Sequence, residues 1–391
     1  MVVLSGIIVN KKRYKTLDMC VHISYICRNS NTLLISKKER KIMEVENVFG
    51  MRLLAARKQA GLSQDDLVRL LDRKISKTAI ARYERGIMEP RPEYVQLLAN
   101  ALKQSMDYFY RPMTTSITRV EFRKNAMGVK RENMIREKIA AFTERYIILE
   151  NLLGVQTTFE KPLKNNLVKD MEDVEQLAEQ LHVEWDLGFK PLGPIMSFLE
   201  EKGIKVLELE AEDKFQGFSA TVQKDIPFII LRKEDTVERR RFTALHELGH
   251  IVLNFHPDLA ENQIEKLCSA FAGAVLLPRL TYNLKIGTQR TDFSKRELGI
   301  IKDRYGISAG AFIMRSVNLG VLPKFRMIAL LNYTRKDKLE KHIGTNQFTD
   351  HPDRFDQLIS MAISEGRISL TKAAELAQID LDTLMQNYVN K

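Results

Sequence analysis

Cysteine is scarce in this chain of 391 residues, which contains only Cys20, Cys27 and Cys268. Three thiols cannot all pair with one another, and no two of them have the C-x-x-C spacing of a cysteine zinc site or a redox motif. The sequence therefore excludes a disulfide framework and is typical of a protein kept in a reducing compartment. We accordingly expect a cytoplasmic protein.

Long apolar runs are lacking as well. No stretch approaches the roughly 18 uncharged apolar residues that a membrane helix needs. The apolar run at residues 2–9 is short, and the basic residues that follow it lie on the wrong side for a secretory signal. We expect no membrane association. With 44% hydrophobic residues, the chain is long enough for two or three domains with cores of their own.

Acidic residues are few in the first part of the chain. Residues 1–165 contain 31 basic and 17 acidic residues, whereas residues 166–391 contain 30 and 33. A polyanion is therefore expected to bind the first part, although such a surplus is also common on a merely solvated face. Residues 1–42 lack helical periodicity, which predicts a poorly ordered basic extension. One hypothesis is that the functional start is Met43.

Short amphipathic helices are predicted from residue 48 onward. Five of them fit the pattern of apolar residues and stop signals: 48–60, 63–71, 76–85, 92–102 and 105–110. Ser63 and Ser76 are candidate N-caps of a helix-turn-helix pair. Its later helix is expected to turn Lys77, Thr78 and Arg82 outward, a face suited to the major groove of double-stranded DNA. A helical bundle used for protein contacts is the alternative.

Two stretches, Gly61 to Leu67 and Ile75 to Pro90, closely resemble the lambda-repressor/Cro (XRE family) helix-turn-helix domain. The resemblance implies that Gln64 binds a phosphate and that Lys77, Thr78 and Arg82 face an operator. The turn between the two helices is about two residues longer than the commonest spacing.

Residues 130–153 predict a long amphipathic helix, with apolar residues recurring every three to four positions from Ile135 to Leu153. We interpret it as part of a helical linker, residues 113–165. The same stripe could instead form the seam of a homodimer, which would suit a palindromic operator, and the pattern alone does not separate the two.

The motif with the clearest chemistry is H-E-x-x-H, formed by His246, Glu247 and His250 within a helical pattern. Positions i and i+4 share one face of a helix, so both imidazoles can bind one Zn²⁺. Glu247 then lies beside the metal as a general base for peptide hydrolysis. Asp235 with Glu238 predicts an N-terminal capping box for this helix. A buried helix with two satisfied histidines is the alternative.

A catalytic zinc site needs a third protein ligand. His256 has the spacing of a known H-E-x-x-H extension, but Leu253 stands where that motif requires glycine. Glu265 is favoured over His256 and Glu261, because it lies in a second helical stretch that can cross the first.

The stretch Arg241 to His250, followed by E-x-x-C-x-x-F-A-x-x-x-L-L-P from Glu265, resembles the ImmA/IrrE family of zinc metallopeptidases. The similarity runs from about residue 195 to 322, and Cys268 stands where alanine is usual. It implies the zinc ligands His246, His250 and Glu265, a catalytic Glu247, and cleavage of a repressor-type regulatory protein.

Together these observations predict a multidomain, mostly α protein. An all-α five-helix lambda-repressor-like domain (43–112) precedes an α+β zincin-like domain (166–325) with a small sheet at about 204–232 and the H-E-x-x-H helix. Two further helices are expected within 294–321, and short C-terminal helices over 326–391.

Two functions are compatible with this sequence. The first is a DNA-binding transcriptional regulator fused to a zinc-dependent endopeptidase. The second is a DNA-binding regulator or antitoxin-like protein whose zinc domain is a sensor or a structural module with little proteolysis.

Overall fold

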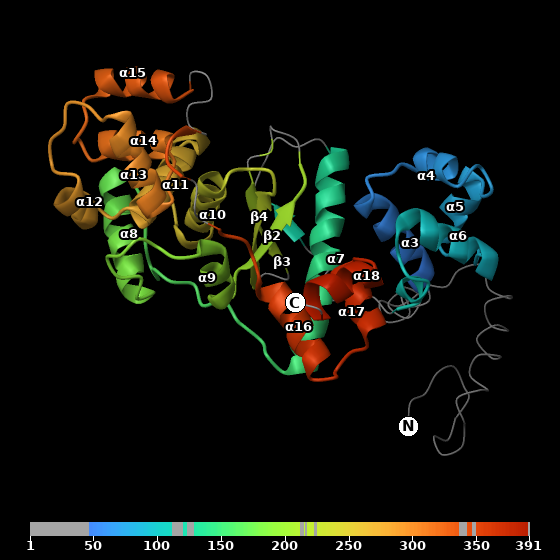
Figure 1. The fold of residues 1–391 in the computed structure, drawn as a ribbon. Helices are drawn as coiled ribbons and strands as arrows, with labels where there is room; N and C mark the ends of the chain where they lie inside the picture. Colours follow the sequence, from blue (N-terminus) through green and yellow to red (C-terminus); the bar gives the residue numbers. More distant parts are fainter. Residues whose placement is uncertain are drawn as a thin grey trace, which may run out of the picture. The chain divides into compact units, whose positions relative to one another are not determined.

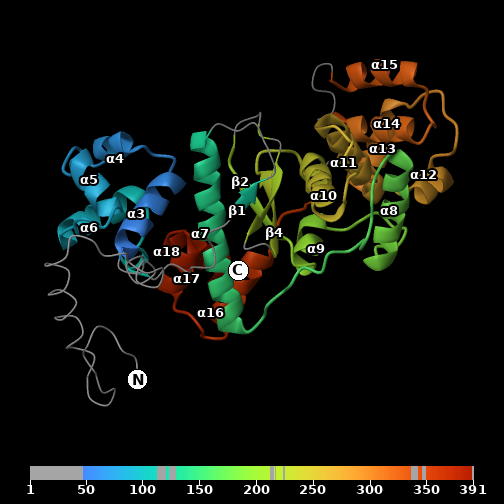
Figure 2. The same ribbon diagram turned by 180° about the vertical axis from the view of Figure 1, so that it is seen from behind.

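The computed structural model describes residues 47–111, 120–122, 129–211, 215, 217–222, 225–335, 342–345 and 349–389. The predicted extension at residues 1–42 and the proposed start at Met43 lie outside them. The chain forms two compact units (Figures 1 and 2). One contains the chain up to Leu54 together with Val68–Pro112, and the other contains Ala55–Leu67 together with Met113–Lys391. Within the described ranges, no helix is both long and apolar enough to cross a membrane.

The N-terminal part of the described chain is helical throughout. Its elements are α3 (Val48–Gln59), α4 (Gln64–Leu70), α5 (Lys77–Glu84), α6 (Pro92–Leu102) and the 3₁₀ helix η1 (Asp107–Phe109). The fifth predicted helix is thus a single 3₁₀ turn. The reason is local: the amide of Tyr108 donates to both the carbonyl and the hydroxyl of Ser105, an i to i+3 arrangement that fixes one turn.

Both predicted serine caps are present. Ser76 accepts a hydrogen bond from the amide of Ala79, and Ser63 accepts one from the amide of Asp66. The Asp66 carboxylate accepts in return from the Ser63 amide, which completes a capping box. The turn after α4 holds Asp72 and Arg73 in left-handed backbone, with φ of 50° and 59°. These two residues accommodate the extra length of the turn.

The second unit is built on a mixed four-stranded sheet with the order β1-β3-β4-β2. The strands are β1 (Val120–Phe122), β2 (Lys205–Leu209), β3 (Phe218–Val222) and β4 (Ile226–Arg232). β3 is antiparallel to both β1 and β4, and β2 is parallel to β4. β2, β3 and β4 were predicted from the sequence, whereas β1 was not, because three residues are too few to show a period.

Both faces of this sheet are buried. Along β4, Ile229 and Leu231 belong to the core on one face, and Phe228 and Ile230 belong to the core on the other. A strand buried on both sides needs an apolar residue at every position, which explains the continuous Phe-Ile-Ile-Leu run. The sheet is therefore the middle of three layers.

Helices from the middle of the chain cover one face. They are α8 (Met171–Glu184), α9 (Ile195–Glu201), α10 (Val237–Val252) and α11 (Glu261–Leu276). Beyond them, on the side away from the sheet, lie α12 (Arg279–Lys285), α13 (Lys295–Tyr305), α14 (Ala309–Asn318) and α15 (Lys324–Arg335) (Figure 1). The two helices predicted within 294–321 correspond to α13 and α14.

The other face is covered by α7 (Val129–Leu153) and by helices near the end of the chain. These are α16 (Arg354–Ser364), α17 (Leu370–Ala377) and α18 (Leu381–Leu384), followed by a π-helical turn at Met385–Val389. The stripe of α7 is buried against the sheet and α16, with Ile139 and Leu149 fully inaccessible. This stripe therefore packs within the chain, which resolves the choice that the sequence left open.

Buried polar contacts attach the start of the C-terminal helices to α9 and α10. Asp350 accepts hydrogen bonds from the amides of Ile195 and Met196 and pairs with Arg241 of α10 at 2.6 Å. Glu200 accepts from the amides of Asp353 and Arg354 at 2.9 and 3.0 Å. Each carboxylate thus caps a helix end that belongs to a distant part of the sequence.

Candidate functional site

The H-E-x-x-H motif lies in the second half of α10. The helix begins after Thr236, whose side chain makes no capping bond. The predicted capping box is therefore wrong: Asp235 instead pairs with Arg232 and Arg239, and Glu238 lies 3.6 Å from Lys302. α10 ends at Val252, two residues before Asn254.

Gly249 lets the second helix of the site approach. A Cβ atom at this position would stand 3.3 Å from the ring of Phe271 and 3.5 Å from the Cα of Cys268, both on α11. The absence of a side chain therefore allows the two helices to pack closely at the turn that carries His250. Glu265, one turn before Cys268 on α11, is brought to the metal-binding face of α10.

Three predicted ligands converge at this crossing. Nε2 of His246 lies 3.1 Å from one carboxylate oxygen of Glu265, and Nε2 of His250 lies 3.2 Å from the other. One ligand atom from each residue fits within a set whose members are all within 4.8 Å of one another. The side chain of Glu265 is 55% exposed, whereas those of the histidines are 15% and 10% exposed. The cluster is thus open toward solvent on the carboxylate side.

These distances fit a zinc ion. Ligand atoms about 2.0–2.1 Å from a tetrahedral ion stand about 3.3 Å from one another, close to the two contacts of Glu265. Two imidazoles and a carboxylate are also the donor set of one class of catalytic zinc site, which leaves a fourth position for water or substrate. The donor chemistry and the spacing therefore agree.

Ser269 fixes the orientation of His246. Its hydroxyl donates to the carbonyl of Glu265 at 2.9 Å and lies 3.2 Å from Nδ1 of His246. Since the hydroxyl proton is already used, Nδ1 must carry a proton and donate it, which leaves the lone pair of Nε2 for a metal. Burial lowers the pKa of the His246 imidazole, and the Glu265 carboxylate opposes that change. The neutral ring is the form that binds metals.

Cys268 has the corresponding position at the other histidine. Its buried Sγ lies 3.4 Å from Nδ1 of His250. From the sequence, Cys268 was only a mild change at a packing position, and Ser269 was not singled out. The sequence pattern that could have identified them is their spacing, three and four residues after Glu265 on one helix. This spacing places both next to His246 and His250 once α10 and α11 are known to cross.

The predicted base Glu247 and the two alternative third ligands, His256 and Glu261, lie in different places. Glu247 follows His246 on α10 and is buried, with 6% of its surface accessible. His256 lies beyond the end of α10, 3.5 Å from the carboxylate of Asp258, and Glu261 is the first residue of α11. Neither His256 nor Glu261 joins the cluster of potential ligands found among the described residues.

The predicted DNA-contacting residues of α5 point outward. Lys77, Thr78 and Arg82 are exposed, while Ile80 and Tyr83 of the same helix are buried. Gln64, the first residue of α4, is partly exposed. The exposed residues of α5 thus place two cations and a hydroxyl group on one face of this helix.

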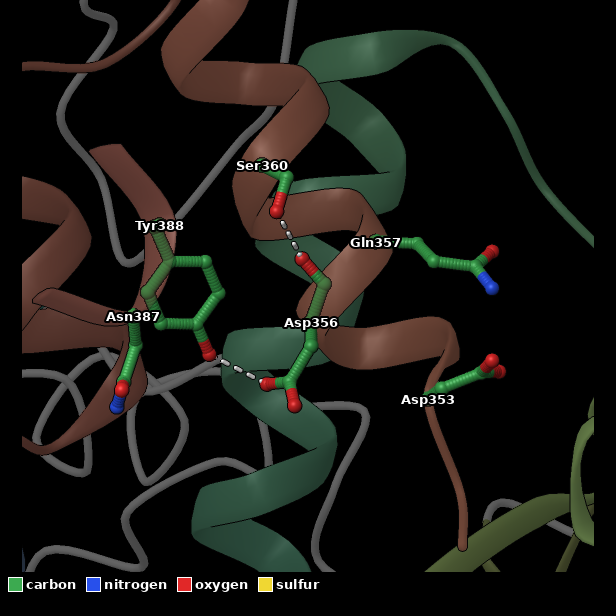
Figure 3. Close-up of a pocket in the computed structure, with 6 residues that line it drawn as sticks. All are labelled: Asp353, Asp356, Gln357, Ser360, Asn387 and Tyr388. Carbon is green, nitrogen blue, oxygen red and sulfur yellow. Dashed lines mark hydrogen bonds between the residues drawn. The ribbon is translucent and has the colours of Figure 1, made fainter. Parts of the chain in front are cut away.

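A further groove lies elsewhere, on the C-terminal helices. It has a volume of about 630 Å³ and is lined by Asp353, Asp356, Gln357, Ser360, Asn387 and Tyr388. Figure 3 shows the Tyr388 hydroxyl donating to Asp356, at 2.6 Å. This groove contains none of the candidate ligands, and its two aspartates are the only ionisable lining residues apart from the tyrosine.

Two regions of the chain match models of known protein families. Residues 199–316 match the family of the IrrE N-terminal-like domain (Peptidase_M78), and residues 53–109 match a helix-turn-helix family. A search of curated proteins found no match. The first match spans both candidate helices of the metal centre, and the second spans α4 and α5. The chain therefore carries a region similar to helix-turn-helix domains, followed by a metallopeptidase-type region similar to the IrrE N-terminal-like domain.

Proposed function

We propose that this protein is a DNA-binding transcriptional regulator with its own zinc-dependent endopeptidase, which hydrolyses a peptide bond in a regulatory protein of repressor type. The observation that carries the proposal is the convergence of His246, His250 and Glu265 from two helices, at distances suited to one Zn²⁺. The family match supports a metal and a peptidase-type domain. The repressor-type substrate rests on the resemblance to ImmA/IrrE proteins.

In this proposal the residues of α10 and α11 divide the work. His246, His250 and Glu265 hold the zinc ion, which when bound supplies a Lewis acid for water and for the scissile carbonyl. Glu247 takes a proton from the attacking water and delivers it to the leaving amine. Ser269 keeps His246 in the tautomer that directs Nε2 toward the metal.

The helix-turn-helix would bring this activity to DNA. Lys77, Thr78 and Arg82 are proposed to face the major groove, and Gln64 to bind a phosphate, as in the helix-turn-helix proteins that the sequence resembles. A homodimer would match a palindromic operator. Since the α7 stripe is buried within the chain, such a dimer would have to use another surface.

The test compares cells that produce the native protein with cells that produce Glu247→Gln. This substitution keeps the size of the side chain and removes the base, so zinc should be retained and cleavage lost. Mass spectrometry of protein N-termini should find new termini, including one in a repressor-type regulator, only with the native protein. The Glu247→Gln protein should also retain the intact substrate in a pull-down.

The second candidate function is a DNA-binding regulator whose zinc domain is a sensor or structural module. It is favoured by the outward face of α5, which presents Lys77 and Arg82 as a binding surface for DNA on a separate element from the candidate metal ligands. Identical protein N-termini and unchanged transcriptional output in the two kinds of cell would support this function and exclude the first.

A further inference from the structure

Helices α12 to α15 form a strongly basic part of an otherwise acidic half of the chain. Residues 279–335 contain 11 Lys and Arg against three Asp and Glu, whereas the rest of 166–391 contains 19 basic and 30 acidic residues. Several of the basic residues form ion pairs within the chain. Arg279 and Arg315 pair with Glu175, Arg290 pairs with Glu297, and Arg326 pairs with Asp292. The others determine what this surface can bind.

Three of the remaining cations surround one groove. Lys285, at the end of α12, and Arg296 and Arg304, on α13, line a depression of about 270 Å³. All three are exposed, and none forms an ion pair or a side-chain hydrogen bond with the part of the chain that the structure describes. The single acidic lining residue, Glu297, is neutralised by Arg290 at 2.7 Å. The groove therefore presents positive charge that the described chain does not balance.

The same groove is apolar between its cations. Ile301 and Tyr305 are buried at its floor, with 4% of each accessible, and Ile300 is 56% exposed along its side. Leu284, next to Lys285, is 72% exposed. Exposed aliphatic side chains at a charged groove are typical of surfaces that bind protein.

We propose that this groove, lined by Lys285, Arg296, Ile300 and Arg304, binds an acidic peptide segment of a partner protein, with carboxylates on the three cations and an apolar side chain against Ile300. The three cations favour a negatively charged ligand, and the aliphatic side chains that line the groove favour a protein segment. Single-stranded nucleic acid is bound by stacking bases on accessible aromatic rings, and the only ring lining the groove is the buried Tyr305. This inference goes beyond the proposed function, because binding here requires neither metal nor cleavage.

The test measures binding of a short fluorescein-labelled glutamate peptide that carries leucines to the full chain, by fluorescence anisotropy. The groove variant combines Lys285→Gln, Arg296→Gln and Arg304→Gln. Its matched control combines Lys164→Gln, Lys169→Gln and Lys190→Gln, three exposed lysines of the same unit without a described ion pair. We expect the groove variant to bind about tenfold more weakly, and the control to bind within about twofold of the native chain at moderate salt.

A second pair of variants tests the apolar contact. Ile300→Asn should weaken binding of the leucine-containing peptide but leave binding of an all-glutamate peptide unchanged. Val183→Asn, at an apolar residue that is 81% exposed on α8, should change neither.

The proposal is overturned if the native chain does not bind the peptide, if the groove variant binds as the native chain does, or if both triple variants lose affinity equally. It is also overturned if the groove variant loses affinity for a DNA duplex as strongly as for the peptide, since the occupant would then be nucleic acid. Circular dichroism of each variant checks that the fold is retained.

Discussion

The candidate metal centre and the outward face of α5 differ in how their side chains are held in position. At the candidate metal centre, the two histidines of α10 are mostly covered and His246 is held by Ser269 of α11, while Glu265 of α11 is 55% exposed. On α5, Lys77 and Arg82 are both exposed and lie on a single helix. The first site therefore depends on the packing of two helices against each other, whereas the residues of the second are all carried by one helix.

The difference predicts different responses to change. A site whose ligands converge from two helices should lose its function almost completely when one ligand is removed, because the remaining ligands cannot complete the coordination of the metal. An exposed cationic face should lose function in steps, since each side chain contributes separately and is screened by salt. The predictions below test this contrast, beginning with the largest effect.

Removal of one metal ligand should have the largest effect. His250→Ala or Glu265→Ala should lower zinc affinity by more than about a hundredfold, because a three-ligand site cannot be completed by water alone. His256→Ala is the matched control and should retain the metal. Zinc content after dialysis decides between them, and loss of zinc from the His256→Ala protein but not from Glu265→Ala would disprove the assignment of ligands.

The exposed face should respond in smaller steps. Lys77→Ala and Arg82→Ala should each weaken binding to a specific operator by about 1–3 kcal/mol, with zinc content unchanged. Each should also reduce the dependence of affinity on salt, because fewer counterions are released. Lys190→Ala, an exposed cation elsewhere, serves as control. Equal salt dependence of native and variant proteins would show that these side chains do not contact DNA.

Loss of the hydroxyl that orients a ligand should cost less than loss of the ligand. Ser269→Ala should weaken zinc binding by about tenfold, because His246 can then adopt the wrong tautomer. Ser269→Thr keeps a hydroxyl and should restore most of the affinity. If both variants bind zinc as the native chain does, the contact at 3.2 Å has no role in holding the metal.

The last effect concerns the stability of the fold alone, and the carboxylate of Glu200, which is buried outside both candidate sites. Burial raises the pKa of Glu200 to about 7, despite two opposing backbone hydrogen bonds. The folded chain therefore keeps this proton up to about pH 7, while the unfolded chain releases it near its usual value, so stability should fall as the pH rises between these values. Glu200→Gln should remove most of this dependence of the free energy of unfolding on pH. Denaturant unfolding at pH 5 and pH 8 gives the change in the free energy of unfolding between these two pH values. An equal change in the native chain and in Glu200→Gln would contradict the raised pKa of Glu200.

Most elements around the candidate sites could be predicted from the sequence, because they carry periodic apolar patterns and capping residues. Ser63 and Ser76 fixed the starts of α4 and α5, and the apolar stripe from Ile135 marked α7. Glu265 was predicted as a ligand from the family resemblance and from its place in a helical stretch that can cross α10, and it lies in the candidate cluster. Short elements were missed, notably β1 and α12, because so few residues show no clear period.

Contacts between distant segments were beyond prediction. The Asp350 carboxylate lies at the centre of a buried network with Arg241, yet its sequence surroundings resemble an ordinary loop. The contacts of Ser269 and Cys268 likewise exist only because Gly249 lets α11 approach α10. A period along one element says which face is buried, but not which element covers it.

The most direct test of the central claim is X-ray absorption at the zinc edge of the purified, zinc-loaded chain. Two imidazoles and one carboxylate predict a first shell of nitrogen and oxygen atoms at about 2.0–2.1 Å, with outer-shell scattering from two histidine rings. The Glu265→Ala protein should lose this signal. A sulfur atom at about 2.3 Å would instead make Cys268 a ligand, and scattering from three imidazoles would place His256 in the site, and either result would contradict the proposed centre.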